Sequence, residues 1–112
     1  MALRRGPHYP RDDLFGGQGR VDVYDLLQGR GMPPFAAVLA CELAPGGSVG
    51  AHRQEDFPEI VVVLEGRGEA TVNGATQPLE PGVVVRLPLG SVLALRNLAD
   101  DQPLAYLIIK AR

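Results

Sequence analysis

The sequence predicts a single all-β domain, a sandwich or a barrel. From Arg20 onward, short segments of β-type composition are separated by glycine and proline, and no stretch keeps a helical period for a dozen residues. Nine such segments in about ninety residues is the strand spacing of all-β folds. The nine segments span residues 20–27, 35–44, 48–53, 59–66, 68–73, 76–80, 83–88, 92–97 and 104–111.

Length and composition agree with one soluble globular domain. A chain of 112 residues buries roughly 65% of its unfolded surface, which is enough for one packed core. With 46% hydrophobic and 21% charged residues, the chain is too apolar to be disordered and too often interrupted by charge for a membrane protein. The longest uncharged apolar run, Ile60 to Leu64, is far shorter than the roughly 20 residues of a spanning helix. We therefore expect no contact with a membrane.

Charge and cysteine content narrow the possible partners further. The formal net charge is -2 and the arginines are scattered, so no basic stripe indicates a nucleic-acid partner. Arg4 and Arg5 are not followed by the apolar segment of a signal peptide, and we expect a cytoplasmic protein. Cys41, the one cysteine, lies in an apolar segment and is interpreted as a buried small residue.

Residues 1–19 differ from the rest of the chain. They combine prolines, glycines and mixed charge without a sustained period, so we predict an N-terminal arm at 1–19 and a barrel domain at 20–112. His8 is interpreted as a solvated histidine of this arm. Asn73-Gly74 predicts a tight two-residue hairpin turn, because such turns require positive φ at both central positions.

Two stretches in the middle of the chain, residues 46–66 and 82–97, carry glycine, polar and proline residues at characteristic spacings. Their spacing agrees at every position with two motifs of small single-domain cupins, G-x5-H-x-H-x3,4-E-x6-G and G-x5-P-x-G-x2-H-x3-N. On these residues the chain resembles that family, which implies a cupin double-stranded β-helix, a jelly-roll barrel. The matching residues are Gly46, His52, Gln54, Glu59 and Gly66 in the first motif, and Gly82, Pro88, Gly90, Leu93 and Asn97 in the second.

The resemblance also implies a site, with two departures. Of the four positions where metal-binding cupins place ligands, His52 and Glu59 are kept, whereas Gln54 and Leu93 replace histidines. His52, Gln54 and Glu59, completed by water or substrate, would suit one divalent ion such as manganese, iron, nickel or zinc. The alternative is a hydrogen-bonded triad without metal, in which Gln54 orients His52 and Glu59 accepts from it. The loss of two imidazoles favours this alternative slightly.

Strand geometry predicts that these side chains converge. His52 and Gln54 are two positions apart, so on a strand they point to the same face, about 6.7 Å from each other. The turn at residues 55–58 can place Glu59 on the neighbouring strand, where its side chain faces the same cavity. We expect the three to form the polar end of a cavity, with Leu93 as an apolar wall.

Two classes of function follow from this site. The first is a small-molecule-binding cupin, with or without catalysis, that accepts a small organic ligand near His52 and Glu59. The resemblance implies that His52 could serve there as a metal ligand or, as in the metal-free sugar epimerases of the superfamily, as a general base paired with a carboxylate. The second is a non-catalytic sensor or assembly module in which Leu93 and its neighbours are core packing. A roomy pocket favours the first class and a filled barrel the second.

A homodimer is also expected. Residues 20–27 and 104–111 are predicted to be the sheet edges of an isolated barrel, and cupins that resemble this chain usually pair through such strands.

Overall fold

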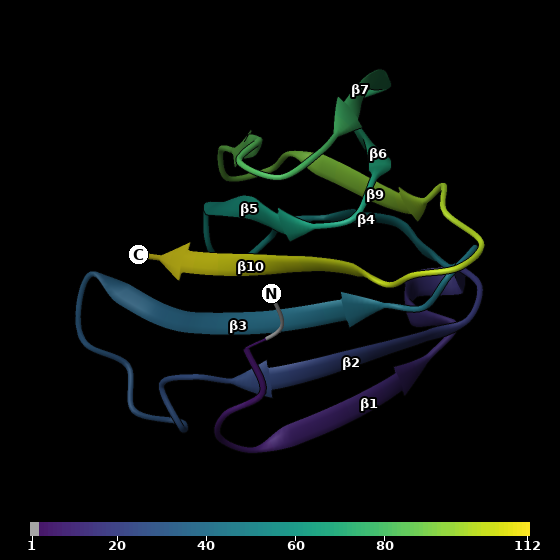
Figure 1. Ribbon diagram of the computed structural model, residues 1–112. Helices are drawn as coiled ribbons and strands as arrows, with labels where there is room; N and C mark the ends of the chain where they lie inside the picture. Colours follow the sequence, from purple (N-terminus) through teal and green to yellow (C-terminus); the bar gives the residue numbers. More distant parts are fainter. Residues whose placement is uncertain (1–2) are drawn as a thin grey trace.

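The computed structural model describes residues 3–112 and is almost entirely β-structure (Figure 1). Each of the nine predicted segments overlaps one strand, so the all-β prediction is confirmed. One further strand, β1, and one short 3-10 turn, η1 (Leu14–Gly16), precede them. The strands are β1 (His8–Asp12), β2 (Arg20–Asp25), β3 (Phe35–Leu43), β4 (Ser48–Arg53), β5 (Glu59–Glu65), β6 (Gly68–Val72), β7 (Ala75–Leu79), β8 (Val84–Leu87), β9 (Val92–Asn97) and β10 (Leu104–Ala111).

The strands form the two facing sheets of a jelly-roll barrel. In the described part of the chain, one sheet has the order β1-β2-β3-β10-β5-β8 and the other β4-β9-β6-β7, with antiparallel pairing throughout. The predicted turn at Asn73-Gly74 joins β6 to β7, with φ of 50° and 85° at the two residues. None of the helical structure within residues 3–112 is long and apolar enough to cross a membrane.

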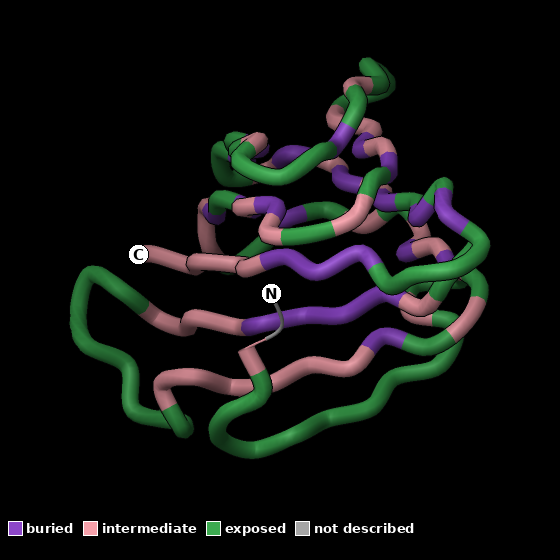
Figure 2. Tube along the Cα trace, viewed as in Figure 1, coloured by how far each residue is buried: buried purple, intermediate pink, exposed green. Residues whose placement is uncertain are grey.

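The core is packed most tightly at one end of the barrel. Buried residues run along the second half of β3 and the first half of β10, which pair Leu43 with Leu104 and Cys41 with Tyr106 (Figure 2). The other halves of these two strands are only partly buried. The barrel can therefore hold a cavity at the end formed by the first half of β3 and the second half of β10, while the core at the other end stays packed.

The N-terminal residues are more ordered than their composition predicts. Residues 8–12, placed by the sequence in an irregular arm, form β1 and pair with β2. All five are exposed, so they lack the alternation that marks a half-buried strand. Contacts hold the strand instead: the His8 ring donates a 2.8 Å hydrogen bond from Nε2 to the Asp22 carboxylate and stacks on Tyr24. Residues 1 and 2 of the predicted arm lie outside the described residues.

The predicted sheet edges were wrong. β10 lies between β3 and β5, and β2 lies between β1 and β3, so both are interior strands (Figure 1). Apolar composition identified them as strands but not their order, because order depends on pairing between distant segments. The homodimer stays a prediction, and it would not form by adding strands to β2 or β10.

Candidate functional site

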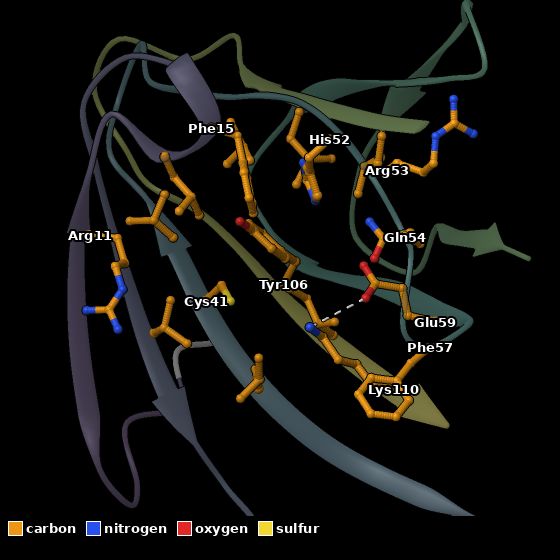
Figure 3. A pocket seen from close by; sticks show the side chains of 18 of the residues that line it. Arg11, Phe15, Cys41, His52, Arg53, Gln54, Phe57, Glu59, Tyr106 and Lys110 are labelled. Atoms are coloured by element: carbon orange, nitrogen blue, oxygen red, sulfur yellow. Dashed lines mark ion pairs between the residues drawn. The ribbon is translucent and has the colours of Figure 1, made fainter. Parts of the chain in front are cut away.

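A cavity of about 490 Å³ opens between the two sheets. Its walls come from β1, β2, β3, β4, β5, β9, β10, η1 and the segment between β4 and β5, and they are mainly apolar. His52, Gln54, Glu59 and Leu93, the four positions taken from the motifs, all line it. Figure 3 shows Gln54 and Glu59 close to each other at one side, and His52 between Gln54 and Phe15.

A bulge in β4 turns His52 toward the cavity. Val49 pairs with Leu95, but the next paired residue is His52, opposite Leu93, so residues 50 and 51 together face one residue of β9. Because of this extra residue, Val49 and His52 share a face although they are three positions apart. Arg53 is exposed, and its guanidinium donates a 2.7 Å hydrogen bond to the carbonyl of Gly90.

The hydrogen bond of His52 sets which ring nitrogen is open. Nδ1 lies 2.9 Å from the carbonyl oxygen of Gly50. A carbonyl oxygen can only accept, so Nδ1 must carry the proton of this bond. In the neutral ring, Nε2 then holds a lone pair and acts as an acceptor. The backbone thus leaves His52 with one nitrogen available to a ligand.

Backbone hydrogen bonds fix Gln54 in place, and its side-chain amide has an unsatisfied donor. Its backbone N–H donates to Ser91 and its carbonyl accepts from Gly90, each at 2.8 Å. The residue is only 7% exposed, and its side-chain Nε2 has no hydrogen-bond partner within residues 3–112. A buried donor left in this state costs about 1–3 kcal/mol. A ligand oxygen in the cavity would remove that cost.

The expected hydrogen-bonded triad is not formed. Among the described residues, no hydrogen bond joins His52 to Gln54 or to Glu59. Nδ1 of His52 donates to the Gly50 carbonyl instead, and the Gln54 amide nitrogen is unpaired. The bulge brings this carbonyl within reach, and strand alternation does not reveal a bulge. The three side chains share a cavity without bonding one another.

Glu59 pairs with a lysine that the sequence analysis did not consider. In the register of β5 and β10, Glu59 lies opposite Lys110, and Oε2 is 4.0 Å from Nζ (Figure 3). Burial raises the pKa of the Glu59 carboxyl, and the charge of Lys110 opposes that shift. The alternation of Tyr106, Ile108 and Lys110 along β10 was the signal that could have placed Lys110 at the cavity.

Glu59→Gln is expected to stabilise the protein at neutral pH. A carboxyl whose folded pKa is raised favours the fold below its unfolded pKa, and this contribution is lost as pH rises through the folded pKa. The difference in midpoint temperature between Glu59→Gln and the parent should therefore be positive at neutral pH. It should shrink as pH falls through the raised folded pKa and should be smallest below the ordinary pKa of glutamate. Thermal unfolding followed by circular dichroism at several pH values checks this. The exposed Glu80→Gln serves as control, and a difference that does not vary with pH would contradict the assignment.

Cys41 and Tyr106 form the closed wall of the cavity. Burial raises the pKa of the Cys41 thiol to about 12, and burial also raises that of the Tyr106 hydroxyl, which interacts with the thiol. The interpretation of Cys41 as a buried residue is confirmed at 3% exposure. A protonated, buried thiol is a poor nucleophile.

Comparison with known proteins identifies the family. The family described as "Cupin domain" matches residues 39–110, which is more than half of the chain. The chain belongs to the cupin family. A curated relative of this cupin, the oxalate-binding protein of Thermotoga maritima, is 34% identical over 114 residues and is covered to 94%, with 97% of this chain aligned.

Solved structures agree with this assignment. A predicted oxalate decarboxylase from Thermotoga maritima superposes on this cupin with a TM-score of 0.87 and 27% identity, covering 99% of this chain and 98% of the other. A Cupin 2 conserved barrel domain protein from Salinispora arenicola gives a TM-score of 0.69 and 29% identity, covering 82% and 76%.

The donor set of this cupin is a poor fit to the metal site of its family. It offers one imidazole, one carboxylate and one neutral amide, and the fourth position, Leu93, is an apolar side chain only 2% exposed. Across residues 3–112, no three His, Cys, Asp or Glu side chains lie together as a metal-binding group. We therefore base the function of the cavity on its own side chains.

Proposed function

We propose that this cupin binds a small organic acid in the barrel cavity, where His52 and Gln54 make the contacts that recognise it. One observation carries the proposal: Gln54, whose buried amide donor Nε2 has no partner, lines the same cavity as His52, whose Nε2 is left open. A donor and an acceptor together match a ligand that has an oxygen beside an O–H group.

The remaining polar groups are consistent with a carboxyl ligand. Gln54 would donate to a carboxyl oxygen, and Nε2 of His52 would accept from the O–H of the acid. After taking up that proton, the same nitrogen would donate to the carboxylate. Lys110 adds a positive charge at the cavity, which Glu59 partly neutralises. The names of the relatives, oxalate-binding protein and predicted oxalate decarboxylase, support a small dicarboxylic acid as the ligand class.

The size of the cavity favours ligand binding over the sensor or assembly alternative. A volume of about 490 Å³ lies within the range of small-molecule sites and exceeds what a filled barrel would leave. A homodimer and a cytoplasmic location stay predictions, and light scattering of the purified chain would test the first.

Proton transfer is the second candidate function, favoured by the lone pair on His52 Nε2. The orienting group for this base is the Gly50 carbonyl and not Glu59. The class of reaction would be removal of a proton from carbon or oxygen next to a carboxyl group. Proton NMR of candidate acids in heavy water, with and without the protein, tests it through loss of the exchanging C–H signal.

Loss of binding in two variants is expected to test the proposed function. Titration calorimetry with oxalate, malonate and succinate, in the presence of a chelator, should show saturable binding by the parent for at least one acid and none for glycerol. His52→Ala should abolish the binding, and Gln54→Leu should weaken it by roughly tenfold, because one hydrogen bond is worth about 1.4 kcal/mol or less. The melting temperature of Gln54→Leu should equal or exceed that of the parent, since an unpaired buried donor is removed.

The chain offers matched controls for both changes. His8→Ala removes the other histidine, and Gln77→Leu removes an amide on β7, outside the cavity lining. Both should bind the acid like the parent. Unchanged affinity in His52→Ala and Gln54→Leu would overturn the proposal.

A further inference from the structure

Phe15 covers one face of the His52 ring. Their centroids are 4.0 Å apart and the planes are inclined by 13°, which is a stacked arrangement (Figure 3). Phe15 belongs to η1, outside both cupin motifs, and it lines the cavity. Phe15 was not predictable as a site residue, because nothing in the composition of residues 1–19 indicates which side chain folds back over the barrel.

The turn that carries Phe15 is fixed to β4. Gln18 and Ser48 exchange two backbone hydrogen bonds, at 3.1 and 2.7 Å, immediately after the turn. The carbonyl oxygen of Phe15 packs on the Cα of Gly50, where a methyl group would overlap it. Gly17 packs equally closely on the carbonyl of Ser48. Glycine at these two positions is what lets the turn lie directly on the strand.

The backbone of Phe15 adopts an unfavourable conformation to reach this position. Its φ of 54° and ψ of 34° lie in the left-handed region, where a bulky residue is rarely found. The residue is also 55% exposed, so burial does not account for the conformation. Strained conformations of this kind are retained where the surrounding contacts fix them, often at functional sites.

We propose that Phe15 is a positioning residue for His52. Gly50 contacts both: its carbonyl accepts from Nδ1–H of His52, and its Cα supports the Phe15 carbonyl. The hydrogen bond holds the imidazole at its edge and the stacked ring holds it at its face. Together they restrict rotation of the ring, keep the proton on Nδ1 and leave Nε2 open on the cavity side. The consequence for ligand affinity rests on the proposed function, whereas the ring position and tautomer do not.

Nitrogen NMR of the ligand-free chain tests the positioning role. With ¹⁵N-labelled histidine at alkaline pH, where imidazole is neutral, the two nitrogens of His52 should show a protonated Nδ1 and an unprotonated Nε2. In Phe15→Ala the two shifts should move toward an exchanging mixture of tautomers. Phe15→Tyr should restore the parent spectrum, and Phe15→Leu, which is apolar but not flat, should resemble Phe15→Ala. Parent-like shifts in Phe15→Ala would overturn the proposal.

Two further variants separate this effect from general loss of packing. Phe35→Ala removes another exposed phenylalanine, on β3 and outside this cavity, and should leave the His52 shifts unchanged. Gly50→Ala leaves the Phe15 side chain intact but displaces its turn, so the folded variant should show the same tautomer mixture as Phe15→Ala. A folded Gly50→Ala with parent shifts would contradict the role of the turn, and if that variant does not fold, the Phe15 series decides alone.

Oxalate titration then links the ring position to binding. Phe15→Ala should weaken oxalate binding by about tenfold, the lower end of what loss of an orienting partner costs at a metal-bound histidine. A parent chain that binds no carboxylic acid would overturn the proposed function while the NMR result still decides the positioning role. If Phe15→Ala changes the tautomer but not the oxalate affinity, Phe15 positions the His52 ring only in the ligand-free protein, and its expected contribution to binding is wrong.

Discussion

Gln54→His combined with Leu93→His is expected to raise the affinity for zinc or manganese by about 100-fold or more, equivalent to ~2.7 kcal/mol. The four positions line one cavity, and Leu93 is the direct cross-strand partner of His52. Three imidazoles and one carboxylate would therefore replace a set with only two strong donors. Competition with a chromogenic chelator measures the change, and circular dichroism checks that the histidine at position 93 leaves the barrel folded.

Histidines added elsewhere provide the control for this double variant. Gln77→His with Leu89→His adds the same number of imidazoles at positions outside the cavity lining, one of them 59% exposed. This control should bind metal no better than the parent. A folded Gln54→His/Leu93→His variant with parent affinity would show that the four side chains do not converge on one point.

Asn97→Asp is expected to destabilise the fold by about 3 kcal/mol. Asn97 is 2% exposed, and its Nδ2 donates to the carbonyls of Leu43, Ala44 and Gln102 at 3.1, 3.2 and 2.9 Å. Its Oδ1 accepts from the backbone of Ala99 at 2.9 Å. Aspartate keeps this last bond but places a carboxylate oxygen against three carbonyl oxygens.

The loss should lower the midpoint of thermal unfolding by roughly 10 °C or more, measured by circular dichroism. Asn73→Asp is the matched control: its Oδ1 accepts from the Val92 N–H, which aspartate can also do, and the left-handed turn position tolerates either residue. Asn73→Asp should unfold close to the parent. If Asn97→Asp does so too, the last position of the second motif has no structural role of this size.

Much of the fold was predictable because its signals are local. Strand-forming segments bounded by glycine and proline gave nine strands, and the Asn73-Gly74 turn followed from the φ angles it requires. The motif spacing also identified four residues that line one cavity. β1 was not predictable, since all five of its residues are exposed and carry no alternation.

The details of the site depend on contacts between distant segments. The predicted hydrogen-bond partners of His52 were wrong because the bulge in β4 brings the Gly50 carbonyl within reach of its ring. A turn from the N-terminal residues packs on this bulge. The cross-strand position of Lys110 depends on the register of β10 against β5. Side-chain alternation along one segment indicates which face a residue occupies but not which residue it meets.

The bulge in β4 also means that the chemistry of the cavity is encoded by the number of residues as well as by their types. In a straight β4 with the same residues paired from Val49 onward, His52 would turn outward and Arg53 would take its place on the inner face. The strand thus has two possible inner faces, one that presents His52 and one that presents Arg53. Removing Ala51 would keep His52 on the inner face, because His52 would then follow Val49 by two positions in a regular strand. When this strand is aligned with that of another protein, a length difference belongs at residues 50–51, and a gap placed elsewhere would assign the wrong side chains to the cavity.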